Sequence, residues 1–155
     1  MTKNLHHYIG IDLGTTNSCI HYGVINPATN RVDPRVVQVD QLTNSGARQN
    51  RELLPSYIWF YPGKPFPYVG EYAKEGLKTQ PSRVAHNIKN YMGIKDWRFE
   101  VDGQQYSAQD LAAQLLQMMS AGIRNRWQYT VDDVIVTVPA SFDPDQREDT
   151  LAAVR

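Results

Sequence analysis

The segment YIGIDLGTTNSCI, residues 8–20, combines an apolar run with a polar turn, and it decides how the chain begins to fold. Residues 8–13 are apolar apart from one Gly and Asp12, which is the pattern of a strand covered on both faces. The apolar pattern resumes in SCIHYGVI after only four residues. The sequence therefore predicts a tight β-hairpin with a carboxylate at the end of its first strand.

The turn of this hairpin, Gly-Thr-Thr-Asn at residues 14–17, has two interpretations. Gly and Asn tolerate positive φ and commonly reverse the chain, so the segment could serve only as a turn. Alternatively, its backbone N–H groups, two hydroxyls and one amide could bind a phosphate, with Asp12 holding a cation or its water molecules. The residues alone leave both interpretations open.

The charge balance of the chain argues against several kinds of partner. Its 155 residues contain 16 Lys and Arg against 16 Asp and Glu, without a run of five like charges. A chain without a summed field is not expected to bind nucleic acid or anionic lipid. Apolar runs such as YIWFY are far shorter than the about 20 residues of a membrane span. With Cys19 as its single cysteine, the sequence favours a soluble protein of a reducing compartment, the cytoplasm.

Turn signals and periodicity predict the elements that follow. VVQV at 36–39 indicates a third strand, and a long polar stretch, rich in Asn, Gln, Ser and Arg, follows at 40–52. Two hairpins and two helices are expected next. The hairpins lie within 55–70, where Pro and Gly separate two extended runs, and within 97–107, around an Asp-Gly turn; the helices span 70–78 and 83–91.

The strongest helix signal runs from Ser107 to about residue 127. Ser107 is a suitable N-cap, and Asp110 lies three residues later, where a carboxylate can reach back to the cap. An apolar stripe follows at helical spacing: Leu111, Leu115, Met118, Met119, Ile123 and Trp127. We interpret this stripe as core, and a Met-rich surface for a partner is the alternative.

A short buried strand, VIVTV at 134–138, ends at Pro139, and a second helix follows it. Asp143 is the expected N-cap, with Pro144 at the first helical position and Gln146 at the third. The sequence ends while this helix is still running, which predicts that it is a piece of a longer protein. The order β-β-β, helix, strand, helix predicts an α/β layer with an antiparallel start, in outline a ribonuclease H-like lobe.

Three motifs resemble those of one family. IGIDLGTTNSC at 9–19 is similar to the first phosphate motif of actin-like ATPases, and specifically of the heat-shock protein 70 family. VIVTVPASFDPDQR at 134–147 resembles the connecting strand and helix of that family, and NIKNYMG at 87–93 resembles its catalytic-lysine segment. The resemblance implies an actin-like ATPase fold for 1–155. It further implies that 1–155 form the N-terminal lobe of that ATPase domain, with a mixed five-stranded sheet, helices and a small inserted α+β subdomain within about 40–130.

The resemblance also implies roles for individual residues. The residues that would contact the β- and γ-phosphates are Gly14, Thr15, Thr16 and Asn17. Asp12 would bind Mg²⁺ through water, and Thr15 would join it and the lysine in the catalytic set. Lys89 would reach the γ-phosphate and orient the attacking water. Because phosphoryl transfer needs positioning and charge neutralisation more than covalent help, such groups suffice.

Pro139 and Arg147 match a pair that, in the family, relays nucleotide state toward the substrate-binding domain. The residues alone are also compatible with purely structural roles. These are a solvated helix position for Lys89, a strand end for Pro139 and a surface helix position for Arg147. The resemblance favours the functional role for Lys89 and leaves both interpretations open for Pro139 and Arg147.

The function implied is that of a molecular chaperone of the stress response, whose ATP or ADP state controls binding of unfolded client polypeptides through a domain absent here. Expected partners are a J-domain cochaperone and a nucleotide-exchange factor. The 155 residues alone are expected to be inactive as an ATPase. The alternatives within the superfamily are a small-molecule (sugar) kinase and an actin-like filament protein.

The sequence departs from the family pattern in three places, which indicates a divergent, bacterial-type member. Ser141 stands where the family usually has an aromatic residue, and Leu53-Leu54 precede Pro55 where a Thr pair is usual. The span from Lys89 to Pro139 is also shorter than usual.

Overall fold

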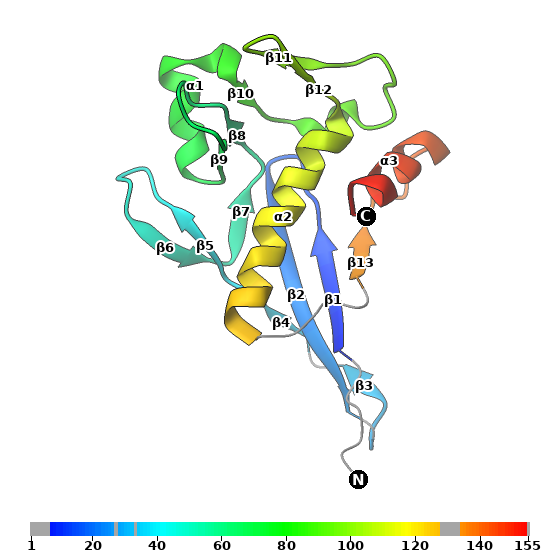
Figure 1. Ribbon diagram of the computed structural model, residues 1–155. Coiled ribbons are helices and arrows are strands. Elements are labelled where there is room, and N and C mark those ends of the chain that lie inside the picture. The colour runs from blue at the N-terminus through cyan, green and yellow to red at the C-terminus, as the bar shows by residue number, and fades with distance from the viewer. Residues whose placement is uncertain (1–6, 27, 33, 128–133, 155) are drawn as a thin grey trace.

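The first two strands form the predicted hairpin at the centre of the fold (Figure 1). The computed structural model describes residues 7–26, 28–32, 34–127 and 134–154. Strand β1 (His7–Asp12) pairs antiparallel with β2 (Asn17–Asn26), and Asp12 lies opposite Cys19. On its other side β1 pairs in parallel with β13 (Val134–Thr137). The sheet is therefore mixed, as predicted.

The main sheet has six strands where five were expected. The difference arises at the far edge of β2, which is ten residues long. Three short strands share this edge: β3 (Arg31–Val32), β4 (Arg35–Val36) and β7 (Leu53–Pro55). A long strand beside several short ones raises the strand count without adding a full layer.

The prediction of one strand at 36–39 is only partly right, because Val36 ends β4 and Val39 begins another strand, with residues 37–38 between them. Val37 N still donates to Ile20 O at 2.8 Å, and the chain then leaves the main sheet. It forms a separate hairpin from β5 (Val39–Leu42) and β6 (Arg48–Arg51). All four residues of β6 are exposed, so this strand lacks the alternation by which the sequence could have shown it.

The hairpin within 55–70 is confirmed as β8 (Ile58–Trp59) and β9 (Tyr68–Val69). The helix at 70–78 is confirmed as two short pieces, η1 (Tyr72–Glu75) and α1 (Gly76–Thr79). The hairpin around the Asp-Gly turn is also confirmed, as β11 (Phe99–Val101) and β12 (Gln104–Tyr106). Both turn residues have positive φ, 52° at Asp102 and 73° at Gly103.

The predicted helix at 83–91 is wrong. The segment divides into η2 (Pro81–Arg83), β10 (Val84–Ala85) and η3 (Ile88–Tyr91). β10 pairs with β8, so its backbone is extended rather than helical. Asn87, with φ 54° and ψ 29°, then turns the chain into η3.

Helix α2 (Ala108–Trp127) crosses one face of the main sheet (Figure 1). Ser107 and Asp110 form the predicted reciprocal cap, since Ser107 N donates to Asp110 Oδ2 at 2.9 Å and Asp110 N donates to Ser107 Oγ at 3.1 Å. The stripe prediction is confirmed for four residues, which are at most 2% exposed: Leu111, Leu115, Met119 and Ile123. Met118 is half-buried, and the Trp127 side chain lies outside the described set.

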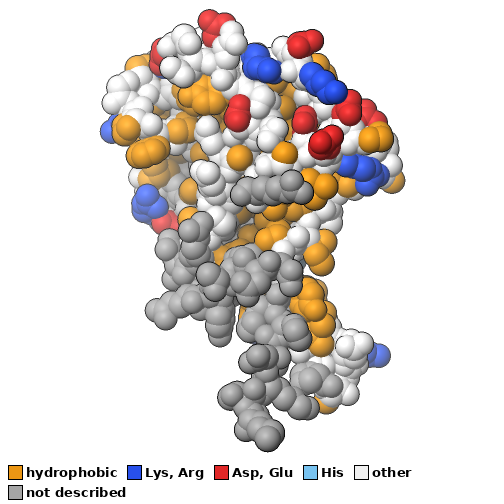
Figure 2. Space-filling view, turned by 45° about the vertical axis from the view of Figure 1, so that its right-hand side comes forward, with side chains coloured by type: hydrophobic (Ala, Val, Ile, Leu, Met, Phe, Trp, Pro, Cys, Tyr) orange, Lys and Arg blue, Asp and Glu red, His pale blue; other side chains and the backbone are white. Residues whose placement is uncertain are grey.

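Helix α3 (Pro144–Val154) also begins with its predicted cap. Gln146 N donates to Asp143 Oδ1 at 2.8 Å, and Asp143 N donates to Gln146 Oε1 at 3.0 Å. Acidic and basic side chains are interspersed on the upper part of the face in Figure 2. None of the helices in the described part of the chain is both long and apolar enough to span a bilayer.

Candidate functional site

Asp12 and Thr137 lie side by side at the carboxyl ends of two parallel strands. They are register partners in the β1–β13 pair, and Thr137 Oγ1 donates to Asp12 Oδ1 at 3.1 Å. Both residues are exposed. The hydroxyl orients the carboxylate while solvent still reaches it, so Asp12 can accept a hydrated cation. The sequence analysis did not identify Thr137, because its pairing with Asp12 spans 125 residues.

A buried pair of serines holds the hairpin turn in place. Ser18 and Ser56 are each 1% exposed, and their Oγ atoms lie 3.0 Å apart. Ser56 Oγ donates to Gly14 O at 2.8 Å, and Gly14 N donates to Ser18 Oγ at 3.3 Å. In addition, Ser56 N donates to Thr16 O at 2.9 Å. The turn is thus anchored to the chain just after β7, and the sequence gives no local signal of this anchor.

The tip of the turn keeps its polar side chains available. Thr15 is half-buried, and Thr16 and Asn17 are exposed. Within the described residues, no hydrogen bond involves these three side chains, whereas the hydroxyl of Ser18 is used internally. An ideal Cβ built on Gly14 would lie 2.0 Å from Asn17 O, so only glycine fits this tight turn. A fixed backbone with free hydroxyl and amide groups is well suited to a phosphate.

Lys89 lies in η3 rather than in the predicted helix, and it is half-buried. Its Nζ atom is 5.5 Å from the centre of the Phe142 ring, a cation–π contact. Phe142 follows β13, so Lys89 lies at the end of the sheet where Asp12 and Thr137 are found. With the residues that the structure describes, Lys89 forms no ion pair and no hydrogen bond to Asp12 or the turn at 14–17.

Pro139 and Arg147 belong to the same connection between β13 and α3. Phe142 N donates to Pro139 O at 3.1 Å, which closes a turn after the strand. Arg147 Nε donates to Phe142 O at 3.0 Å, and its Nη2 donates to Ala140 O at 3.4 Å. Arg147 therefore holds the turn that starts at Pro139, without a direct bond to Pro139 itself. A role in relaying nucleotide state stays a prediction.

Cys19 faces Asp12 across the hairpin ladder and is half-buried. Burial, and secondly the negative charge of Asp12, raise the pKa of the Cys19 thiol. The protonated thiol is therefore favoured in the folded chain. Because its folded pKa lies above the unfolded one, Cys19 contributes stability that is complete below the unfolded pKa, about 8.5, and is lost as pH rises through the folded pKa.

This coupling gives a direct test of the position of Asp12. We expect Asp12→Asn to accelerate iodoacetamide alkylation of Cys19 at pH 8 by roughly two- to fivefold, since about 0.4–1 kcal/mol of charge repulsion is removed. The measurement is the alkylation rate from pH 7 to 10. The rate curve of the variant should shift to lower pH and reach the same plateau. If the two curves coincide, the charge of Asp12 does not influence the pKa of the Cys19 thiol.

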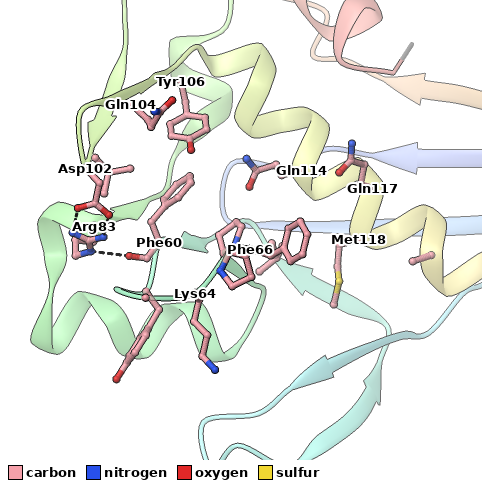
Figure 3. Close-up of a pocket in the computed structure, with 17 residues that line it drawn as sticks. Phe60, Lys64, Phe66, Arg83, Asp102, Gln104, Tyr106, Gln114, Gln117 and Met118 are labelled. Carbon is pink, nitrogen blue, oxygen red and sulfur yellow. Dashed lines mark hydrogen bonds and ion pairs between the residues drawn. The ribbon is translucent and has the colours of Figure 1, made fainter.

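A surface cavity of about 550 Å³ lies elsewhere, between α2, the β11–β12 hairpin and the loop after β8 (Figure 3). Arg83 lines it but is fully engaged: its Nη1 donates to Asp102 Oδ1 at 2.7 Å, its Nη2 also pairs with Asp102, and its Nε donates to Phe60 O at 2.7 Å. This pairing lowers the pKa of Asp102. None of the predicted site residues lines the cavity.

The donor groups around Asp12 fit one class of metal. Among the described residues, no group of three or more His, Cys, Asp or Glu side chains could hold a metal by itself. A lone exposed carboxylate instead suits Mg²⁺, which binds through one or two carboxylates, keeps several waters and takes further oxygens from substrate phosphates.

Residues 8–155 match the model of the family described as Hsp70 protein.

Proposed function

The chain belongs to the Hsp70 protein family, and we propose that its hairpin turn binds the β- and γ-phosphates of ATP while Lys89 serves their hydrolysis. Family membership supports an actin-like ATPase fold and a chaperone-type, nucleotide-binding role. The observation that carries the proposal is the anchored turn, whose tip leaves the side chains of Thr15, Thr16 and Asn17 without hydrogen bonds to described residues.

The residues of the site have separate tasks in this proposal. Backbone N–H groups of the turn and the hydroxyls of Thr15 and Thr16 donate to phosphate oxygens, and Gly14 allows the close approach. Asp12, oriented by Thr137, accepts hydrogen bonds from the waters of a cation. Mg²⁺ bound with the nucleotide would neutralise charge on the phosphate oxygens.

Lys89 provides the mobile positive charge. Its ammonium group rests over the Phe142 ring and has no carboxylate partner among the described residues, so it can move to the γ-phosphate without breaking an ion pair. There it would stabilise the charge that builds up on the phosphoryl oxygens and orient the attacking water.

The wider role concerns the protein as a whole. We propose that nucleotide state controls the binding of unfolded clients through another domain, with Pro139 and Arg147 in the relay. The turn that Arg147 holds contains Phe142, which Lys89 contacts, and this supports a link from the phosphate site to α3. The proposed partners are a J-domain cochaperone and a nucleotide-exchange factor, and the proposed location is the cytoplasm. We also propose that 1–155 form an N-terminal lobe with a subdomain within about 40–130.

The proposal is tested by calorimetric titration of Mg·ATP into the full-length protein. Micromolar or tighter binding that is lost when Thr15 and Thr16 are both changed to valine would support the phosphate turn. Valine keeps the shape of threonine and removes only the hydroxyl. Absence of binding by the wild-type protein would remove the ATPase proposal.

Replacing Asp12 with asparagine should raise the Mg²⁺ concentration for half-maximal turnover by roughly tenfold. This is the smaller of the losses in metal affinity that are typical when a residue contacting a metal only through other ligands is changed. A neutral amide attracts the cation and its waters less than a carboxylate does. The measurement is steady-state ATP hydrolysis at fixed ATP over a Mg²⁺ titration. Asp96→Asn, at an exposed position, is the control, and an unchanged Mg²⁺ curve for Asp12→Asn would leave Asp12 with a structural role only.

A further inference from the structure

One carboxylate on α3 accepts a hydrogen bond from the backbone of the segment that carries Lys89. Asp149 Oδ2 accepts a hydrogen bond from Gly93 N at 2.7 Å, across 56 residues of sequence. Gly93 has φ of +81°, and an ideal Cβ there would lie 2.8 Å from Gln146 Cγ. The turn after η3 is therefore pressed against α3, with a carboxylate at the contact.

Besides this hydrogen bond, the segment is held by apolar packing, by the stacking of Tyr91 on Trp97 with ring centres 4.2 Å apart, and by a 3.9 Å contact from Lys95 Nζ to Asp145 Oδ2 on α3. η3 is four residues long and has no side-chain cap at Asn87. Its core contacts come mainly from Ile88 and Met92, which are 2% and 1% exposed, and Tyr91 packs against the same core. Burial of these apolar side chains holds the segment against the core. Because the hydrophobic effect is non-directional, it does not by itself fix the orientation of the segment. A hydrogen bond to a charged acceptor adds direction at a defined point.

The contact partner of Lys89 is tied to the same helix. Arg147 Nε donates to Phe142 O, and the centre of the Phe142 ring lies 5.5 Å from Lys89 Nζ. Helix α3 thus holds both sides of the Lys89–Phe142 contact, through Arg147 on one side and Asp149 on the other. Changing either bond would change the spacing between the two residues.

We propose that Asp149 is a positioning residue for Lys89: by holding Gly93 N against α3, it sets the place from which the lysine reaches the γ-phosphate. This inference rests on the proposed ATPase function. Asp149 touches neither nucleotide nor water in this role and acts only through the backbone of residues 89–93. A misplacement of about 1 Å is enough to cost up to 10²-fold in rate, so a single anchor can matter.

The test compares variants of the full-length protein in ATP hydrolysis. We expect Asp149→Ala to lower kcat about tenfold with KM for ATP within about twofold of wild type, because binding groups on the hairpin are untouched. Asp149→Asn keeps an oxygen that can accept from Gly93 N, so it should recover most of the rate and serves also if the alanine variant folds poorly. Glu148→Ala, at the exposed neighbouring position, should match wild type.

A double variant separates positioning from general destabilisation. If Asp149 acts through Lys89, Asp149→Ala should cost less than about twofold in a Lys89→Ala background, whereas independent losses would multiply. Multiplied losses, or a full rate for Asp149→Ala beside a slow Lys89→Ala, would overturn the positioning role and leave the ATPase proposal standing. A wild-type protein without ATP turnover, or an unaffected Lys89→Ala, would overturn the proposed function first.

Discussion

Lys89→Ala should lower ATP turnover in the full-length protein by at least about tenfold, the smallest effect typical of removing a group that stabilises charge in the transition state. The lysine Nζ rests on the Phe142 ring, so it is free to move to the γ-phosphate. Nucleotide affinity should stay within a few-fold of wild type, because the hairpin turn is intact. Single-turnover hydrolysis measures the chemical step, and calorimetry measures affinity.

The matched control is Lys78→Ala, which removes a surface lysine paired with Glu75 at 2.8 Å. This change should leave turnover within about twofold, since exposed pairs contribute little. If Lys89→Ala also stays within twofold of wild type in a single turnover, Lys89 has no catalytic role and is only a lysine of the η3 segment.

Gly14→Ala should have the second large effect, on nucleotide affinity. The added Cβ would lie 2.0 Å from Asn17 O, so the turn must change shape, at a cost of about 1–3 kcal/mol in the free energy of unfolding. The phosphate donors at residues 15–17 then move, and affinity for Mg·ATP should fall by at least about tenfold. Calorimetric titration and urea unfolding measure the two effects separately.

Gly10→Ala, in strand β1 of the same hairpin, provides the comparison. Its Cβ would meet only His21 Cβ at 4.0 Å, which is ordinary contact, so affinity should change less than about twofold. Equal affinities for the Gly14 and Gly10 variants would show that the shape of the turn at residues 14–17 does not determine phosphate binding.

Local patterns predicted much of this fold. The hairpin at 8–20, the capping boxes at Ser107 and Asp143, and the Asp-Gly turn all depend on residues within a few positions of one another. Such features are determined by short-range hydrogen bonds and periodicity, so they can be predicted from the local amino-acid sequence.

The errors have a common physical origin in long-range pairing. Residues 84–85 are extended because they pair with β8, and residues 48–51 form a strand because they pair with β5, although neither segment has the matching periodicity. In the site, Ser56 and Thr137 escaped notice because they meet the hairpin only across 38 or more residues. The motif at 87–93 points to Lys89, whereas the conformation of its backbone could not be predicted from the local sequence.

The parallel pairing of β1 with β13 has a consequence for the order in which the protein folds. The hairpin can form early, since its strands are neighbours in sequence, but the bond from Thr137 to Asp12 closes a loop of 125 positions. Closing so long a loop carries a large entropic cost and is expected late in folding. During synthesis the hairpin would therefore leave the ribosome with its carboxylate unrestrained, and the cation site would mature only when residues 134–137 dock.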